Sequence, residues 1–217
     1  MNIALINASP KAGKSNTGIL LDALGEHLSQ HLPETCAIHH YHLGRKTFSP
    51  ETVREIADNN VIVLGFPLYF DALPADLMAM LLTLEAYLQA ANRNDICVYA
   101  LINNGFYEGG QNCLAFEIVQ NWCDHAKVQF GGGIGQGAGE VIGVMNRFPW
   151  SLGFFRKTNR ALAVLARDIA ARKPAGINYL TPAFPRFLFA FIAKHFFWHP
   201  LARKNGVRKP DLLKRAV

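Results

Sequence analysis

The sequence predicts an α/β fold built on a parallel sheet, and two observations carry this prediction. Continuous apolar runs, which are typical of strands buried on both faces, occur at residues 3–6, 61–66 and 96–102. Each run is followed, after a loop, by a segment whose apolar residues recur at three- and four-residue spacing, as in a helix that covers a sheet. Runs and helical segments that alternate in this way are typical of strand–helix–strand units, whose strands lie parallel.

Five strands and five helices are expected between residues 3 and 172. The strands are expected at residues 3–6, 35–43, 61–66, 96–102 and 128–131, and the second is polar enough to lie nearer the sheet edge. The helices are expected from residue 15 or 16 to about 28, and over residues 50–58, 75–90, 112–126 and 156–172. The second helix has a clear start, because Ser49 can cap it and Pro50 takes its first position.

The loop at residues 7–17 has the character of a phosphate-binding loop. It joins the first strand to the first helix, where unpaired backbone N–H groups and the positive end of the helix dipole attract an anion. The loop also supplies side-chain donors and positive charge: Ser9, Ser15, Asn16, Thr17, Lys11 and Lys14. We therefore expect a phosphate at this position.

Residues 8–15 also satisfy a loose P-loop pattern, which would indicate a nucleotide triphosphatase. Two features of the loop disfavour this alternative, because its first position is Ala8 and not Gly, and because Pro10 removes a backbone amide that should wrap the phosphates. The runs at residues 61–66 and 96–102 also lack the terminal aspartate that would help to hold magnesium.

Two later strands end in loops that carry aromatic and small residues, PLYFDALP from Pro67 and NNGFYEGG from Asn103. Together with the first loop, the stretches ASPKAGKSNT, GFPLYFDALPADL and NNGFYEGGQN resemble, in order and spacing, the three flavin-binding loops of the flavodoxin-like NAD(P)H-dependent FMN reductase family. The resemblance covers about residues 1–143. One departure is Ala8, which stands where family members often have Gly before the Ser-Pro pair.

The resemblance implies a flavodoxin-like three-layer α/β/α sandwich, with a five-stranded parallel sheet in the order 2-1-3-4-5 and a ligand at the carboxyl ends where the order reverses. It implies FMN as the cofactor and NAD(P)H as the co-substrate. The FMN phosphate would be bound by Ser9, Lys11, Ser15, Asn16 and Thr17. The ribityl chain and ring would be bordered by Pro67, Leu68, Tyr69 and Phe70, and the other ring edge by Asn103, Asn104, Gly105 and Phe106.

The function expected from this resemblance is an FMN-dependent oxidoreductase that passes electrons from NAD(P)H to a small molecule: a quinone, a nitro or azo compound, or free flavin. No catalytic acid or base is expected, because hydride transfer to flavin requires proximity and alignment. The alternatives are a flavodoxin-type electron carrier, a membrane-associated flavoprotein without nicotinamide turnover, and the triphosphatase. Carriers of that type are usually acidic around the flavin, which a near-neutral main domain does not match.

Other residue patterns point away from metal, disulfide and dinucleotide sites. The four cysteines form no CxxC pair, which disfavours a zinc ribbon, an iron–sulfur cluster and a disulfide scaffold. His39, His40 and His42 have no carboxylate or cysteine support, so no metal site is expected. The glycine run at residues 131–143 meets only the loosest dinucleotide fingerprint, since no further strand with an acidic residue is expected after it, and we expect a flexible loop near the flavin edge.

The chain is expected to divide into a flavin-binding domain, residues 1–145, and a helical, aromatic-rich, basic C-terminal extension, residues 146–217. Residues 184–217 carry 8 Lys and Arg against 1 acidic residue, whereas residues 1–183 carry 14 against 15, so a nucleic-acid role for the main domain has no electrostatic support. The apolar segment at residues 184–198 is too short and interrupted for a membrane span, which leaves a dimer arm, a lid over the flavin, or an interfacial membrane anchor. A homodimer is implied by the family, and a cytoplasmic location is expected because no signal peptide is apparent.

Overall fold

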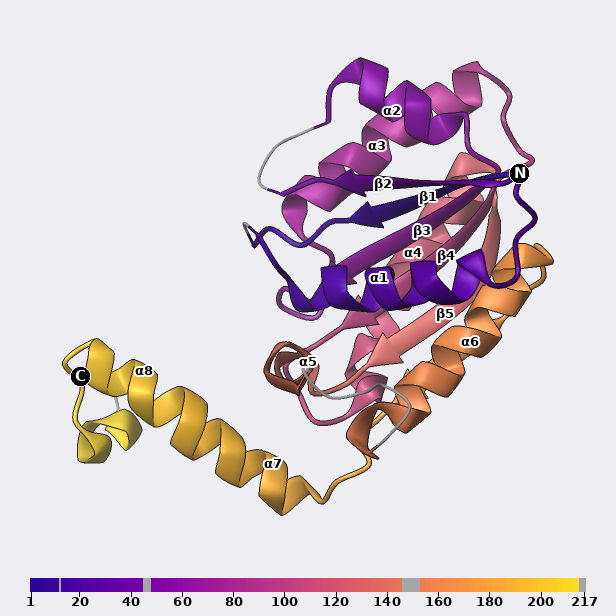
Figure 1. Ribbon diagram of the computed structural model, residues 1–217. Helices are drawn as coiled ribbons and strands as arrows, with labels where there is room; N and C mark the ends of the chain where they lie inside the picture. The colour runs from indigo at the N-terminus through magenta and orange to yellow at the C-terminus, as the bar shows by residue number, and fades with distance from the viewer. Residues whose placement is uncertain (12, 45–47, 146–152, 215–217) are drawn as a thin grey trace.

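The computed structural model describes residues 1–11, 13–44, 48–145 and 153–214. A twisted parallel sheet lies between two layers of helices, and a helical segment projects from this body near the C-terminus (Figure 1). We call this projecting segment, residues 186–204, the C-terminal arm. The expected boundary after residue 145 falls where the described residues stop and resume.

Within the described residues the sheet has six strands in the order β2-β1-β3-β4-β5-β6, and every neighbouring pair is parallel. The strands are β1 (Asn2–Asn7), β2 (Ala37–His42), β3 (Val61–Pro67), β4 (Cys97–Asn103), β5 (Gln129–Gln136) and β6 (Gly176–Leu180). The first five have the predicted order, which with helices on both faces is that of the flavodoxin-like fold. The expectation of only five strands was wrong.

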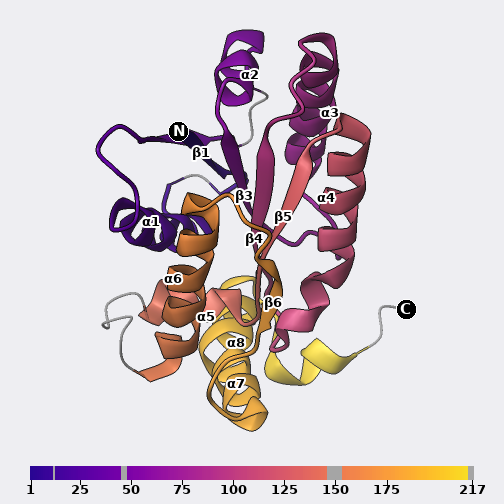
Figure 2. The same ribbon diagram turned by 90° about the vertical axis from the view of Figure 1, so that its right-hand side faces the viewer.

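The helices form the two outer layers. Helices α1, α5 and α6 pack on one face of the sheet, and α2, α3 and α4 on the other; Figure 2 shows α1 and α6 opposite α3 and α4. Their bounds are α1 (Asn16–Ser29), α2 (Pro50–Ala57), α3 (Ala75–Ala90), α4 (Cys113–Ala126), α5 (Gly139–Met145) and α6 (Arg156–Ala170). Short 3-10 turns are η1 (Gly109–Asn112), η2 (Gly153–Phe155) and η4 (Lys209–Leu213), and the arm consists of α7 (Arg186–Ile192), the π-helical η3 (Ala193–Trp198) and α8 (His199–Lys204).

Strand β6 was not predicted, because it lies at the sheet edge and is mostly exposed, so its residues form no continuous apolar run. It exists because it pairs with β5, with Gly132 opposite Gly176 and Gln136 opposite Leu180. The segment expected to be wholly helical therefore contributes a strand, and also α6, whose Leu162, Leu165 and other apolar residues join the core beside α1. The extension completes the sandwich before the arm begins.

The glycine run expected to be a flexible loop instead forms most of β5. A Cβ on Gly133 would lie 1.8 Å from the carbonyl oxygen of Ala100, and Gly132 has a φ of +92°, which favours glycine. The absence of side chains lets β5 approach β4 where the register shifts between Val98 and Tyr99. Glycine serves close packing here, and the loop prediction was wrong.

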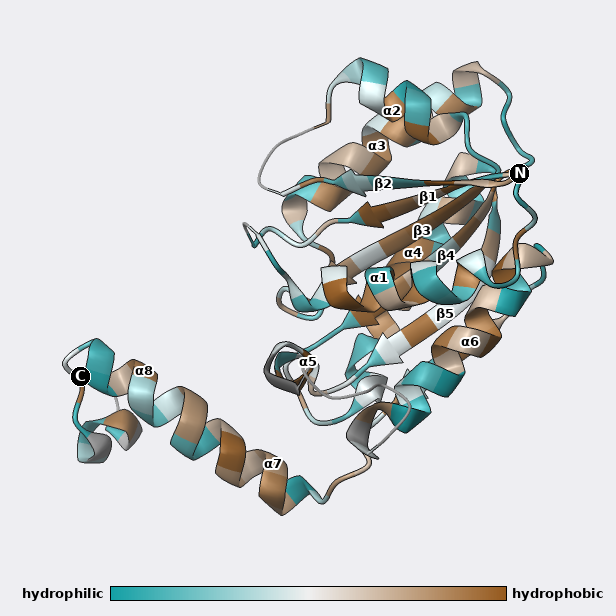
Figure 3. Cartoon of the chain, in the orientation of Figure 1, coloured by the Kyte–Doolittle hydropathy of each residue, from teal (hydrophilic) through white to brown (hydrophobic). Residues whose placement is uncertain are grey.

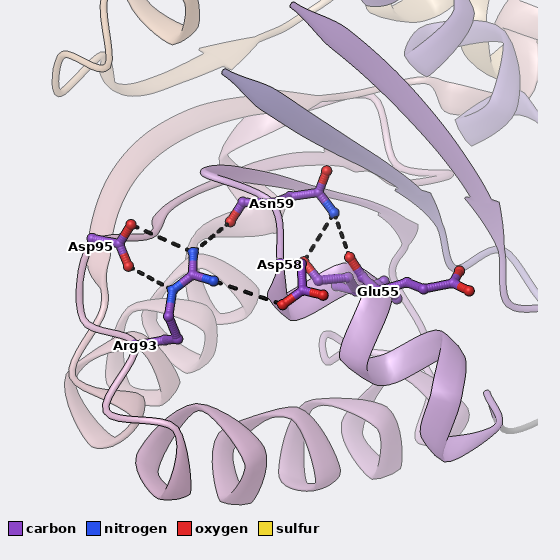
Figure 4. A network of polar contacts seen from close by, with 6 residues as sticks. Glu55, Asp58, Asn59, Arg93 and Asp95 are labelled. Carbon is purple, nitrogen blue, oxygen red and sulfur yellow. Dashed lines mark hydrogen bonds and ion pairs between the residues drawn. The ribbon is translucent and has the colours of Figure 1, made fainter.

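A polar network at the amino edge of the sheet fixes two connections far from the strand ends that carry the predicted loops (Figure 4). Arg93 donates to Asp95 at 2.8 Å and to the carbonyl of Asn59 at 3.4 Å, and its guanidinium lies 3.9 Å from Asp58. The hydrogen bond from Arg93 holds the pKa of Asp95 below its ordinary value. These contacts join the turn before β3 to the turn before β4.

The tight contact of β5 with β4 predicts that Gly133→Ala is strongly destabilising. The new methyl group would overlap the backbone of β4, so we expect the free energy of unfolding, measured by urea titration, to fall by about 3 kcal/mol. Gly110→Ala is the matched control, because a Cβ there meets nothing within 4 Å and should change stability by less than about 0.5 kcal/mol. Equal stability of the two variants would contradict the packing described for β5.

Candidate functional site

The site is expected at the carboxyl ends of β1, β3 and β4, because the strand order reverses there. The chain leaves β1 towards β2 on one side and returns to β3 on the other, and ligands of open α/β sheets bind at such a reversal, outside the carboxyl ends of the strands. All three loops identified from the sequence start at this edge, at residues 8, 68 and 104.

The first loop is held in shape by Asn7, the last residue of β1. Its Oδ1 accepts a hydrogen bond from the backbone N–H of Ser9 at 3.1 Å, and its Nδ2 donates to Ser15 Oγ at 3.2 Å. Ser15 caps α1, since its Oγ accepts from the backbone N–H of Gly18 at 3.0 Å. Asn7 therefore fixes both ends of the loop, a role that the sequence did not reveal, although it placed Asn7 at the start of this loop.

The hydroxyl groups of this loop suit a phosphate group. Ser9 Oγ accepts from the backbone N–H of Lys11 at 3.4 Å, and Ser15 Oγ accepts from Gly18 as the helix cap. Because these oxygens accept from the backbone, each hydroxyl proton remains to be donated, and that of Ser15 makes only a long hydrogen bond of 3.5 Å to Asn7 Oδ1. The loop also brings an exposed Lys11 and the first turn of a 14-residue helix, and residues 8–18 contain no carboxylate.

Asn16 and Thr17 face neighbouring elements of the site. Thr17 is buried, and its Oγ1 donates to Asn103 Oδ1 in the third loop at 2.7 Å. The Asn16 Oδ1 lies 2.5 Å from the position that a Cβ on Gly143 would occupy, so this side chain packs against α5. Thr17 thus uses its proton in a short, buried hydrogen bond, whereas the hydrogen bond that Ser15 donates to Asn7 Oδ1 is 3.5 Å long.

The second loop is a tight turn that presents two aromatic rings. Tyr69 and Ala72 exchange backbone hydrogen bonds of 3.0 Å, and the central residues Phe70 and Asp71 have φ angles of +49° and +60°. Two positive φ angles are the mark of a type I′ turn. Tyr69 is 48% exposed and Phe70 fully so, whereas Pro67 and Leu68 are partly buried at the base of the turn.

The third loop is stabilised from within by Asn104. Its Oδ1 accepts from the backbone N–H of Phe106 at 2.8 Å, and its Nδ2 donates to the carbonyl of Glu108 at 3.2 Å. The Asn104 backbone donates to the carbonyl of Gln136 at 3.0 Å, which ties the loop to the end of β5. Gly105 and Phe106 are exposed at the tip, and the Phe106 ring is available to contact a ligand.

Asn103 joins the three loops. Its side chain accepts from Thr17 of the first loop, and its carbonyl accepts from the backbone N–H of Leu68 at 2.9 Å. The structure therefore brings together Thr17, Leu68 and Asn103 from the predicted set, while Tyr69 and Phe106 lie at exposed loop positions. The sequence placed Asn103 among the site residues, but its role as the junction depends on a contact between residues 86 positions apart.

Residues outside the predicted set also support the site. Gln136 at the end of β5 is buried, and its Oε1 accepts from Thr158 Oγ1 of α6 at 2.8 Å. The backbone N–H groups of Ala138 and Gly139 donate to the carbonyls of Phe106 and Asn104 at 2.5 and 2.6 Å, which holds the start of α5 against the third loop. These contacts join residues that lie far apart in the sequence, and no motif in the sequence indicates them.

The site offers hydrogen-bond donors and aromatic rings. Among the residues that the structure describes, no group of three or more His, Cys, Asp or Glu side chains could hold a metal ion. Within the same residues, no helix has the length and apolarity needed to cross a membrane. The arrangement suits an anion at the first loop and a flat aromatic group between the second and third.

Comparison with known proteins identifies the fold. No family model and no curated protein sequence matches the chain. An FMN-dependent NADH-azoreductase from Bacillus anthracis str. Ames Ancestor, solved in complex with FMN, matches with a TM-score of 0.56 and 9% identity, over 78% of this chain and 100% of that one. The Trp repressor binding protein from Bacillus subtilis matches with a TM-score of 0.55 and 16% identity, over 75% and 96% of the chains.

A third solved structure agrees with these two. An NADPH-quinone reductase from P. pentosaceus matches with a TM-score of 0.54 and 17% identity, over 78% of this chain and 98% of that one. At such identities the likeness establishes architecture and not activity. The chain therefore has the flavodoxin-like α/β/α fold, shared with an FMN-dependent azoreductase and an NADPH-quinone reductase.

Proposed function

We propose that the protein is an FMN-dependent oxidoreductase that takes a hydride from NAD(P)H and passes two electrons to a small-molecule acceptor. The observation that carries this proposal is the junction at Asn103, which joins a phosphate-type loop to two loops with exposed aromatic rings. A phosphate and a flat ring linked by a chain are the parts of FMN that these loops would contact. The FMN bound in the azoreductase of the same fold supports the proposal.

In this proposal the FMN phosphate lies at the first loop. Ser9 and Ser15 would donate their hydroxyl protons, Asn16 and the first amides of α1 would add hydrogen bonds, and Lys11 would add positive charge. Thr17 would act differently, because it fixes Asn103 and thereby the spacing between the phosphate and the ring. We therefore assign to Thr17 a positioning role.

The ring would lie between the second and third loops. Pro67 and Leu68 form the base of the second loop, and Tyr69 with Phe70 supplies aromatic surface above it. On the other side Asn103, Asn104, Gly105 and Phe106 would border the second edge, with Phe106 free to pack against the ring. These loops would fix the ring and leave one face for the nicotinamide or the acceptor.

FMN, when bound, supplies the two-electron chemistry, and the protein supplies binding and alignment. The preformed loops would hold the ring in one orientation, which is the main requirement for a hydride to reach it. We propose a quinone, a nitro or azo compound, or free flavin as the acceptor, because the exposed rings Tyr69, Phe70 and Phe106 suit planar aromatic molecules.

The proposed function predicts that the purified protein binds FMN and that NADH or NADPH bleaches it in the absence of oxygen. The test is the visible absorbance of the oxidised flavin after rapid anaerobic mixing. Fast bleaching is expected of a reductase, whereas a carrier of the flavodoxin type would keep its colour. A protein that binds no flavin but binds ATP with magnesium would support the triphosphatase alternative instead.

The phosphate loop predicts that Ser15→Ala weakens FMN binding at least about tenfold, because a hydrogen bond to a charged group is lost. The dissociation constant can be measured by quenching of FMN fluorescence. Ser49→Ala is the matched control, since Ser49 caps α2 in the same way, through the backbone N–H of Thr52. Both variants should lose about 1 kcal/mol of stability, but the control should bind FMN normally.

The junction predicts that Thr17→Val destabilises the fold and also weakens FMN binding. The variant leaves the buried Asn103 Oδ1 without its donor, so the free energy of unfolding should fall by about 1–3 kcal/mol. Thr17→Ser keeps the hydroxyl and should retain wild-type affinity while it loses about 0.8 kcal/mol for the missing methyl group. Wild-type FMN affinity in Thr17→Val would show that this hydrogen bond does not position the loops.

A further inference from the structure

The C-terminal arm places large apolar side chains on the protein surface. It projects away from the sheet, and apolar residues follow one another along α7 (Figure 3). Phe187 is 75% exposed and Trp198 58% exposed, and the other large exposed residues of the arm are Phe191, Phe196, Phe197 and Leu201. Such a concentration of exposed apolar surface marks an interaction site.

The base of the arm is fixed to the third loop of the site. The Tyr107 hydroxyl donates to the carbonyl of Phe184, and the Tyr107 ring lies 6.1 Å from that of Phe184 and 5.6 Å from that of Phe189. Arg186 forms an ion pair with Glu108 at 3.1 Å. The exposed aromatic residues therefore lie on a helix with a defined attachment.

Positive charge is concentrated on the same segment. Residues 184–217 carry 8 Lys and Arg against 1 acidic residue, a net charge of +7, while residues 1–183 have a net charge of −1. Within the described part of the chain, Lys194, Arg203, Lys204 and Arg208 pair with no carboxylate. The segment therefore attracts a partner that carries negative charge.

A cavity of about 800 Å³ lies between the end of the arm and the turn that follows it. The positively charged residues around it are Arg203, Lys204 and Arg208, with His195 and His199 on the arm and Val207 and Leu212 as apolar lining. A cavity lined by both cations and apolar side chains suits a phosphate attached to a hydrocarbon group.

We propose that the C-terminal arm docks the protein on the surface of an anionic lipid bilayer. The exposed Phe and Trp side chains enter the interface between headgroups and acyl chains, and the cations of the arm and of the cavity bind lipid phosphates. The 19 residues of the arm span about 28 Å and carry Lys194 near the middle, which fits a helix lying along the surface. This docking goes beyond the proposed redox function and does not depend on it.

The charge distribution favours a lipid surface over a second copy of the chain. A second copy would offer the arm a body with a net charge of only −1, which gives little attraction to a segment of +7. An anionic bilayer instead attracts each Lys or Arg near it, and it also accepts aromatic side chains at the interface. The bilayer thus matches both properties of the arm.

The test is co-sedimentation of the full-length protein with vesicles of phosphatidylglycerol and phosphatidylcholine, compared with vesicles of phosphatidylcholine alone. We expect binding to the anionic vesicles that weakens as salt is raised. A variant with Arg203→Gln, Lys204→Gln and Arg208→Gln should bind about a hundredfold more weakly, since each charge contributes about fivefold. The matched control replaces the exposed body residues Lys127, Lys157 and Lys173 with Gln and should bind nearly as well as the wild type.

A second variant removes the aromatic side chains. Phe187→Ser, Phe191→Ser and Trp198→Ser together should abolish vesicle binding while the melting temperature stays close to that of the wild type, because these side chains are exposed. Equal binding to neutral and anionic vesicles, or equal losses in the charge variant and its control, would overturn the proposal. The proposal would also be overturned if the wild type bound no vesicles and formed a dimer that the aromatic variant dissociates. A second copy of the chain would then cover the arm.

Discussion

The hydrogen bond from Thr17 to Asn103 is the constraint on which the rest of the site depends. It joins the start of α1 to the end of β4, and both side chains are buried. A buried polar group that loses its partner is costly, so the two loops are held at one spacing before any ligand arrives. Because the Asn103 carbonyl also accepts from Leu68, the loop after β3 is held by the same residue. A ligand that bound between these loops would therefore pay little conformational entropy for ordering them.

The opposite side of the site depends on the glycines of β5. They let this strand approach β4, and the strand ends at Gln136, whose carbonyl accepts from the third loop. The next residues start α5, which returns two N–H groups to the same loop through Ala138 and Gly139. The sheet packing and the loop geometry therefore form one system. A side chain added within β5 would change the site without touching it.

Sequence reasoning succeeded where burial leaves a clear pattern. Strands β1, β3 and β4 are buried on both faces and read as apolar runs, and Ser15 marks the start of α1 as predicted. It failed for β6, an exposed edge strand that only its pairing with β5 defines, and for the length of β5, which was expected to end at residue 131 but continues through glycines that carry no hydropathy signal. The residues of the three loops could be selected from their positions after strands. The junction at Asn103 could not, because it follows from the register of the sheet.

The attachment of the arm at Tyr107 has a thermodynamic consequence. Tyr107, whose hydroxyl donates to the carbonyl of Phe184 at the base of the arm, follows Phe106 directly in the third loop. A ligand whose binding moved Phe106 and Tyr107 would change the free energy with which the arm is attached. Linkage requires that attachment of the arm then changes the free energy of ligand binding by the same amount. The proposed ligand contact at Phe106 and the attachment of the arm at Tyr107 therefore involve adjacent residues of one loop.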